Sequence, residues 1–295
     1  MQARKHPNFL IVGAAKAGTT SIAKYLEEHP EVFMAEEKEP FYFLRESVAN
    51  LPKDDLMRDI IRKKLHADAT SYYGMFDEVK DEKRSGEATV HYLYHYDEVI
   101  PKVRDELGDV PIIIVLRDPS RRAFSNYTYQ KRIEFGSFEE ALKNEETKKS
   151  KGWNSFWYYR DQGNYYLAVK AYLENFSSVH VCFFEDLKEN PSRFMSEMYS
   201  FLEVDKNFTP NVETRHNQTV VPKNRFIKWL YYLKIKYKIR LGLPKAVKKN
   251  LLSASIKQET EVINEQTLKE LRVYYKPNIK KLEMLLSKDL SKWYD

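Results

Sequence analysis

The chain has 295 residues, of which 42% are hydrophobic, and 49 Lys and Arg against 43 Asp and Glu give a formal net charge of +6 at pH 7. This length can bury a full hydrophobic core, and no repeat or Gly-, Ser- or Pro-rich stretch divides it, so we expect one domain over residues 1–295. The single cysteine, Cys182, excludes an intrachain disulfide framework. No apolar run approaches the roughly 18 residues of a membrane-spanning helix, and residues 1–7 lack the apolar core of a signal peptide, so we expect a cytoplasmic protein.

The first predicted strand and the first predicted helix join through a glycine-containing loop. Residues 8–13 are a short apolar, partly β-branched run typical of a buried strand, and apolar residues repeat at helical spacing within 19–29. The backbone N–H groups of the loop and the positive end of the helix then point at one place. We therefore expect a phosphate site between these two elements.

The loop itself is almost a Walker A motif. Gly13 and Gly18 have the separation of G-x-x-x-x-G-K-[ST], but Thr19 occupies the position of the phosphate-binding lysine, and Lys16 lies inside the loop instead. A nucleoside triphosphate with Mg²⁺ needs the lysine after the second glycine and a carboxylate on the metal. A phosphate ligand without that geometry fits better, and we expect no metal. The residues that offer donors or charge are Lys16, Ala17, Gly18, Thr19, Thr20 and Ser21.

A second anion site is expected after a later strand. Residues 111–116 are a continuous apolar run, the pattern of a central parallel strand, and Arg117 follows at the edge where α/β sheets bind ligands. A helix is expected at 119–131, with Asp118 or Ser120 as its cap. Ser125 lies about two turns beyond Arg117, so both side chains can hold a second phosphate. An arginine that ends a strand is also often only a surface ion pair.

Strands and helices alternate along the rest of the chain. The other elements expected are a helix near 53–66, a region 86–93, helices at 95–107, 137–147 and 163–175, a strand at 179–184 and a helix at 191–202. This alternation predicts an α/β protein with a P-loop-like, three-layer fold, in which helices flank a central parallel sheet and the C-terminal third is helical.

Residues 214–258 contain twelve Lys and Arg and no Asp or Glu. Aromatic and aliphatic residues lie among these lysines, so 223–249 could be a basic interfacial helix with a peripheral membrane contact. A solvated basic face over a helical core fits the same pattern. The basic balance alone does not indicate a nucleic-acid partner, and we expect none.

Two of these motifs together resemble a known family. Lys-x-Gly-Thr-Thr in the first loop and L-R-D-P-x-x-R-x-x-S-x-Y after the later strand are similar to the sulfotransferases that use 3′-phosphoadenosine-5′-phosphosulfate (PAPS), especially the carbohydrate branch that includes the heparan sulfate enzymes. The likeness continues through 38–43, 86–93, 181–187 and 290–293, so it covers nearly the whole chain. The Golgi relatives are membrane-anchored, whereas a chain that begins so near its first strand looks like a bacterial enzyme or a trimmed catalytic domain.

The resemblance implies a role for each anion site. The first loop would bind the 5′-phosphosulfate of PAPS, and Arg117 and Ser125 would bind the 3′-phosphate. Lys223 and Arg225 fall where the family closes a loop over that phosphate. The product would be adenosine 3′,5′-bisphosphate. Because charge develops on the leaving phosphate, Lys16 and the loop amides are expected to stabilise it.

Sulfuryl transfer also needs a base for the attacking hydroxyl. Glu39 resembles the catalytic glutamate that the heparan sulfate branch places in an E-x-x-F-F segment, and aromatic neighbours would raise its pKa. It also belongs to an acidic cluster with Glu36 and Glu37, which is typical of a solvated turn. His91 is the alternative base, because the cytosolic branch uses histidine. His95 is expected at the surface.

The acceptor is less clearly indicated. Where the heparan sulfate enzymes carry a lysine and a proline, this chain has Ala88 and Val90, which puts the type of acceptor in doubt. Residues 152–165 combine flat aromatic faces with polar tips and suit either a sugar ring, a lipid headgroup or an ordinary core. Glu87 is either a structural group or a substrate contact. The residues proposed to contact the acceptor are Glu87, His91, Trp153, Trp157 and Arg160.

The sequence therefore predicts an enzyme that moves the sulfuryl group of PAPS to a hydroxyl, or less readily an amine, of a glycan or glycolipid. The transfer would be in-line and metal-independent, with Glu39 as general base. The alternative from the same loop is a P-loop kinase that acts on a nucleoside or small metabolite.

Overall fold

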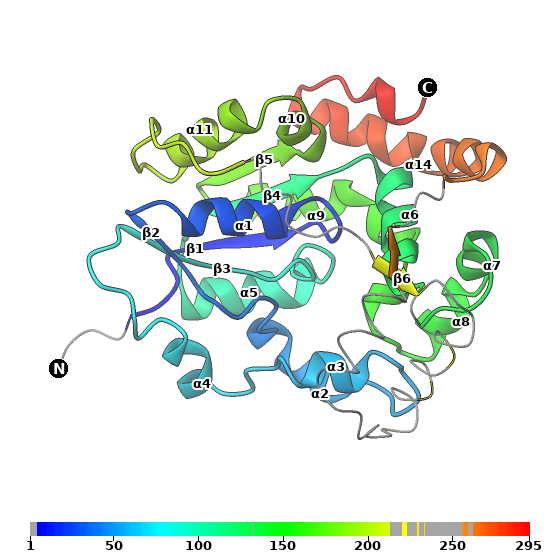
Figure 1. Cartoon of the computed structure of the whole chain (residues 1–295), viewed down its shortest axis with the longest axis horizontal. Helices are drawn as coiled ribbons and strands as arrows, with labels where there is room; N and C mark the ends of the chain where they lie inside the picture. Colours follow the sequence, from blue (N-terminus) through cyan, green and yellow to red (C-terminus); the bar gives the residue numbers. More distant parts are fainter. Residues whose placement is uncertain are drawn as a thin grey trace.

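The computed structural model describes residues 5–131, 133–212 and 262–295, and between the last two ranges only 220–222, 229, 233 and 256–258. A five-stranded sheet has the order β2-β3-β1-β4-β5, and each neighbouring pair is parallel (Figure 1). The strands are β1 (Phe9–Gly13), β2 (Val32–Met34), β3 (Arg84–Ala88), β4 (Ile112–Leu116) and β5 (Val179–Phe183). A separate antiparallel pair joins β6 (Val220–Pro222) and β7 (Ile256–Gln258).

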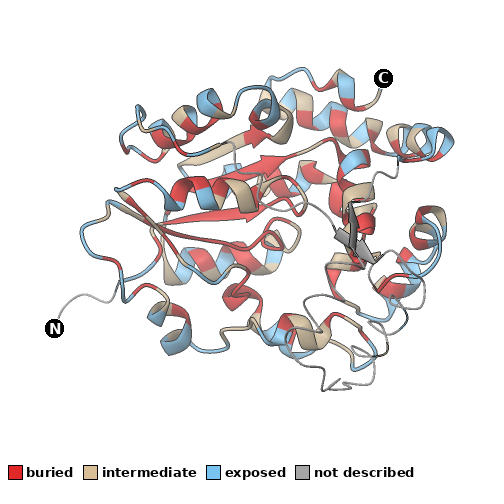
Figure 2. Ribbon diagram, viewed as in Figure 1, coloured by how far each residue is buried: buried red, intermediate tan, exposed pale blue. Residues whose placement is uncertain are grey.

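Burial explains which strands the sequence reveals. Every residue of β1 and β4 is buried, because both strands lie inside the sheet, and their sequences are accordingly continuous apolar runs (Figure 2). The strands expected at 8–13, 111–116 and 179–184 are confirmed to within one residue at each end. The sequence of β3, RSGEA, has no such pattern. Its Gly86 packs against the ring of Phe9, where a Cβ would come within 2.3 Å of a ring atom, so tertiary packing defines this strand.

Helices cover both faces of the sheet. In Figure 1, α1 lies over the near face beside α11, and the Tyr199 hydroxyl donates a hydrogen bond to the Tyr25 carbonyl at 2.9 Å. Behind the sheet, α5 packs against α9. The expected three-layer α/β architecture is therefore confirmed. The α-helices are α1 (Thr19–Glu27), α2 (Arg45–Ala49), α3 (Arg58–Arg62), α4 (Ala69–Gly74), α5 (Tyr96–Glu106), α6 (Pro119–Gln130), α7 (Phe138–Lys143), α8 (Glu145–Ser150), α9 (Tyr165–Asn175), α10 (Phe184–Glu189), α11 (Pro191–Phe201) and α14 (Glu265–Leu286). The 3₁₀ helices are η1 (Tyr42–Leu44), η2 (Ser155–Trp157), η3 (Asp161–Gly163) and η4 (Ser291–Trp293).

Some of the expected helices differ from the structure. The helix near 53–66 is only α3, because the Asp55 carboxylate accepts a hydrogen bond from the Met57 N–H at 2.8 Å and makes a turn there. The helix at 137–147 is two helices, α7 and α8, that meet at Asn144. The short β2 and α10 are not predicted from the sequence.

The C-terminal third is helical where it is described, through α14 and η4. Most of 214–258 lies outside the described residues, and so do Lys223, Arg225 and nearly all of the expected interfacial helix at 223–249. Within the described ranges, no helix has both the length and the apolar character needed to cross a bilayer.

Candidate active site

The loop between β1 and α1 is shaped to hold an anion. Gly18 precedes the helix with φ 84°, and a Cβ there would lie 2.8 Å from the Phe184 ring, so only glycine fits. Lys16 also has a positive φ, 68°. The N-terminus of α1, beginning at Thr19, faces the loop with the positive end of the helix dipole. The loop has the geometry that the sequence predicts.

The two predicted anion motifs meet at the carboxyl edge of the sheet. The Ala14 N–H donates to the Val115 carbonyl at 2.7 Å, which ties the loop to the end of β4. From the residue after β4, the Arg117 guanidinium donates to the Lys16 carbonyl at 2.9 Å and lies over the Phe184 ring at 4.7 Å. Asp118 caps α6 as expected, since its carboxylate accepts from two N–H groups of the first turn.

Helix α6 brings Ser125 to the same region. Ser125 is half-buried in this helix. One turn further along α6, the Tyr129 ring makes a cation–π contact with the Lys16 ammonium, which lies 4.1 Å from the ring centroid. The structure therefore brings together Lys16, Arg117 and the helix that carries Ser125, which are the main elements expected to bind the donor.

Glu39 is held at the end of β3. Its N–H donates to the Ala88 carbonyl at 3.1 Å, and its carboxylate accepts from the Val90 N–H at 3.0 Å. Only 8% of the residue is exposed, whereas Glu36 and Glu37 are exposed, so the solvated turn does not extend to Glu39. Burial raises the pKa of Glu39, and the cations of Lys38 and Lys64 and the Val90 N–H oppose this rise.

Lys38 is a member of the site that the sequence motifs do not indicate. Its ammonium donates to the hydroxyl of Thr19 at 3.0 Å and to that of Thr20 at 2.6 Å, and it lies 3.9 Å from the Glu39 carboxylate. The lysine missing from position 19 of the loop was the signal that could have prompted a search for a cation from another segment. Sequence spacing alone does not show that Lys38 folds back onto the loop.

His91 is the buried alternative base, with 1% of its surface exposed. Its Nδ1 is hydrogen-bonded to the Ser155 hydroxyl at 2.9 Å, and the same hydroxyl is hydrogen-bonded to His95 Nε2 at 3.0 Å. In the described part of the chain, His91 Nε2 has no hydrogen-bond partner. Burial lowers the pKa of His91 well below its ordinary value, so the ring is neutral. His95 is half-buried and not the surface residue expected, because it contacts Ser155.

A cavity of about 380 Å³ lies beside these groups. Its described walls come from the segment 41–51, from His91 and His95, and from 152–158. Phe41, two residues after Glu39, lines the cavity. His91 also lines it and directly follows Val90, whose N–H donates to Glu39. His91 therefore belongs to the cavity wall, whereas Glu39 lies two residues from the wall along the chain, and the cavity has the size of a small-ligand pocket.

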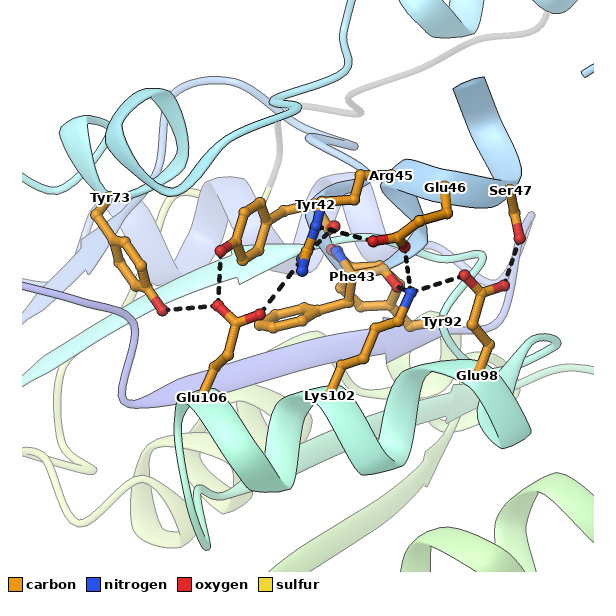
Figure 3. Close-up of polar contacts among 10 residues, drawn as sticks. All are labelled: Tyr42, Phe43, Arg45, Glu46, Ser47, Tyr73, Tyr92, Glu98, Lys102 and Glu106. Atoms are coloured by element: carbon orange, nitrogen blue, oxygen red, sulfur yellow. Dashed lines mark hydrogen bonds and ion pairs between the residues drawn. The ribbon is translucent and has the colours of Figure 1, made fainter. Parts of the chain in front are cut away.

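The wall formed by residues 42–47 is fastened to helix α5 (Figure 3). Lys102 on α5 donates to the Phe43 carbonyl at 3.2 Å and pairs with Glu46. Figure 3 also shows hydrogen bonds from Ser47 to Glu98, and from Tyr42 and Arg45 to Glu106. These contacts fix the position of the segment that follows Glu39.

Three of the five residues expected to contact the acceptor do not line this cavity. Glu87 is fully buried, and its carboxyl group accepts hydrogen bonds from the Thr89 and Tyr72 hydroxyls, at 2.8 and 3.4 Å. Trp157 is fully buried in the core, where its indole N–H donates to Asp55 at 2.9 Å. Arg160 lies over the Tyr274 ring of α14 and does not line the cavity. Trp153 and His91 do line it.

Among the residues that the structure describes, no group of three or more His, Cys, Asp or Glu side chains is arranged to hold a metal ion.

The comparisons with known proteins agree with this geometry. The family model described as "Sulfotransferase domain" matches residues 6–272, so the chain belongs to the sulfotransferase family. The chain is a sulfotransferase enzyme, not the kinase considered as an alternative, and the family uses PAPS as its sulfuryl donor.

The individual proteins to which the chain is similar share less than a third of its residues in the matched regions. A sulfotransferase structure from Alicyclobacillus acidocaldarius is 29% identical with a TM-score of 0.76, and the match covers 99% of this chain and 100% of that one. A membrane-associated sulfotransferase, kil1 of Dictyostelium discoideum, is 27% identical over 127 residues, which are 42% of this chain and 23% of that protein. A structure of mouse sulfotransferase SULT7A1 complexed with PAP is 14% identical with a TM-score of 0.46, and the match covers 96% of this chain and 90% of that one.

The described residues fit the donor. PAPS is an anion, and the loop presents helix N–H groups, hydroxyls and two lysines where a phosphate would lie. The guanidinium of Arg117 lies against the same loop.

Proposed function

We propose that this sulfotransferase acts on a hydroxyl, or less readily an amine, of a glycan or glycolipid, and that Glu39 is its general base. The observation that carries the proposal is the buried Glu39 carboxylate, which lies 3.9 Å from the Lys38 ammonium at the phosphate loop and accepts a hydrogen bond from the Val90 N–H, one residue before the cavity-lining His91. When bound, PAPS supplies a sulfuryl group that passes to the acceptor oxygen and leaves adenosine 3′,5′-bisphosphate behind.

The donor would be held from both ends. The N–H groups and hydroxyls at Gly18, Thr19, Thr20 and Ser21 would bind the phosphosulfate, while Arg117 and Ser125 would bind the 3′-phosphate. Lys16 would stabilise negative charge as it develops on the leaving phosphate. Its ammonium rests on the Tyr129 ring at 4.1 Å and lies on a flexible side chain that can turn toward the anion.

Glu39 would take the proton of the acceptor hydroxyl as the oxygen attacks. Burial raises the pKa of Glu39, which makes its carboxylate a stronger base, and the cations of Lys38 and Lys64 oppose this rise. The hydrogen bond from Val90 fixes one carboxylate oxygen, so the other oxygen, Oε1, is the one that can accept the proton.

The cavity would receive the acceptor. Phe41, Trp153 and Tyr158 offer aromatic surface that suits the apolar face of a sugar ring or the start of a lipid. Asn154 and Ser47 offer polar groups for ring hydroxyls. A screen of neutral glycans and glycolipids with labelled PAPS tests this choice, and labelling confined to simple phenols would contradict it.

The base is tested with Glu39→Gln, which keeps the size and hydrogen bonding of the side chain but cannot accept a proton. We expect kcat to fall by roughly 10²–10⁴ while the affinity for adenosine 3′,5′-bisphosphate, measured by calorimetry, stays unchanged. His91→Asn is the matched comparison for the alternative base. If Glu39→Gln keeps near-full activity and His91→Asn is inactive, the base is His91.

A further inference from the structure

Lys38 occupies the place that the phosphate loop leaves without a lysine. In G-x-x-x-x-G-K-[ST] the lysine follows the second glycine, and here that residue is Thr19. The Lys38 ammonium donates to the hydroxyls of both Thr19 and Thr20, at 3.0 and 2.6 Å. A cation from the segment after β2 therefore lies at the first turn of α1, as the loop lysine would in a Walker A motif.

The position is unfavourable for a cation unless an anion joins it. The N-terminus of α1 carries positive partial charge, and only 23% of the Lys38 side chain is exposed. A neighbouring cation, Lys64, donates to the Lys38 carbonyl at 3.1 Å. The carboxylate within ion-pair distance is that of Glu39, at 3.9 Å, and it also accepts from the Val90 N–H. Burial lowers the pKa of Lys38, because a buried ammonium loses its hydration.

The ammonium groups of Lys16 and Lys38 contact different elements beside the loop. The Lys16 ammonium lies against the Tyr129 ring of α6, on the side where Arg117 joins the loop. The Lys38 ammonium lies at the start of α1, on the side of Glu39. The loop region therefore carries two lysines, one against α6 and one at the first turn of α1.

We propose that Lys38 is a second donor-binding lysine, which would contact the phosphosulfate end of PAPS and keep Glu39 ionised as a base. This inference rests on the proposed placement of the donor and on the proposed role of Glu39. It adds a cation from outside the loop to the groups that neutralise charge in the transfer.

Binding tests the first part. Lys38→Met keeps the length and apolar stem of the side chain, and we expect it to weaken adenosine 3′,5′-bisphosphate binding roughly 10- to 100-fold in calorimetry, because it removes a charge-assisted contact. Lys24→Met is the matched control. Lys24 is exposed on helix α1, whose first turn Lys38 contacts, and it pairs only with Glu27 in the described contacts. It should change the affinity less than about 2-fold. Lys38→Arg, which keeps the charge, should recover part of the affinity.

The pH dependence of kcat/KM tests the second part. Removing a cation beside a carboxylate raises the pKa of that carboxylate, so the acid limb of the profile should move to higher pH in Lys38→Met and stay in place in Lys24→Met. A lysine that served only to hold the loop together would lower the thermal midpoint without moving this limb.

Arg117→Ala separates failure of this inference from failure of the donor placement. If Arg117→Ala weakens binding while Lys38→Met matches the wild type in affinity and pH profile, Lys38 has no such role and the donor site stands. If neither variant weakens binding, the donor is misplaced and both proposals fall. Circular dichroism of each variant shows whether it is folded.

Discussion

Three residues of the candidate site, Lys16, Glu39 and Phe41, hold their backbones in the left-handed region, with φ of 68°, 63° and 55°. Each such conformation costs a non-glycine residue on the order of 1–3 kcal/mol and persists only where the surroundings enforce it. For Glu39 the enforcing contacts are its two hydrogen bonds to the residues at and just after the end of β3. The strain therefore lies where the carboxylate must be positioned.

Burial changes the proton affinity of Glu87, and this has a consequence for stability. Burial, helped by the charge of Glu39, raises the pKa of Glu87 to about 8. The folded protein thus keeps a proton that the unfolded chain releases near pH 4.5, so the stabilising contribution of Glu87 is complete below that pH and is lost as the pH rises to about 8.

Glu87→Gln is neutral at every pH and should remove this contribution to the pH dependence. In urea unfolding at pH 5 and pH 8, we expect the variant to lose less stability than the wild type over this interval, by on the order of 3–4 kcal/mol. The acceptor KM should not change, because the carboxyl lies in the core. Equal pH slopes would show that Glu87 is not a buried protonated group, and a raised acceptor KM would show that it contributes to acceptor binding.

At the scale of elements, the predictions from sequence succeed where local pattern and tertiary position coincide. β1 and β4 are central, so their apolar runs reveal them, and Arg117 could be placed because it follows β4 directly. Lys38 contacts Thr19 and Thr20, which precede it in the chain by 19 and 18 positions, and no sequence periodicity predicts these contacts. The hydrogen bonds of the Ser155 hydroxyl to His91 and His95 cannot be predicted from the sequence for the same reason. The burial of Trp157 and Glu87 could not be predicted from the sequence, because aromatic and acidic residues serve a core as readily as a ligand.

The contacts between α5 and the segment 42–47 predict how the cavity wall is maintained. Lys102→Met removes the hydrogen bond to the Phe43 carbonyl and the ion pairs with Glu46 and Glu98. We expect the acceptor KM to rise several-fold and the unfolding free energy to fall by about 1 kcal/mol, while the affinity for adenosine 3′,5′-bisphosphate is unchanged. Steady-state kinetics and calorimetry measure the two effects separately.

The control for this prediction is Lys170→Met, which breaks an exposed pair with Glu174 on α9. It should leave acceptor KM and donor affinity at wild-type values. A donor affinity that falls in Lys102→Met would mean that the segment 42–47 supports the phosphate loop and not the acceptor cavity.

In the whole molecule, the donor and acceptor regions have different structural origins. The donor residues follow the ends of β1 and β4, so the central sheet fixes their positions. The described walls of the cavity come mainly from short helices and loops outside the sheet, within 41–51 and 152–158. The sheet has a strong signature in the sequence and the loops have almost none. This is why the cofactor could be predicted from the sequence and the identity of the acceptor could not.

Donor binding should therefore stabilise the molecule as a unit, since the loop, β4 and α6 all contribute to it. A ligand that binds only the folded state at about 100 times its Kd adds about 2.7 kcal/mol to stability. For a chain of 295 residues that corresponds to a rise in Tm of roughly 4–5 °C. We expect adenosine 3′,5′-bisphosphate to produce this shift equally with and without EDTA, because the loop and Arg117 supply the positive charge. ATP with Mg²⁺ should give a smaller shift, and Arg117→Ala should reduce the bisphosphate shift. A shift that vanishes with EDTA would show that a metal ion takes part in donor binding.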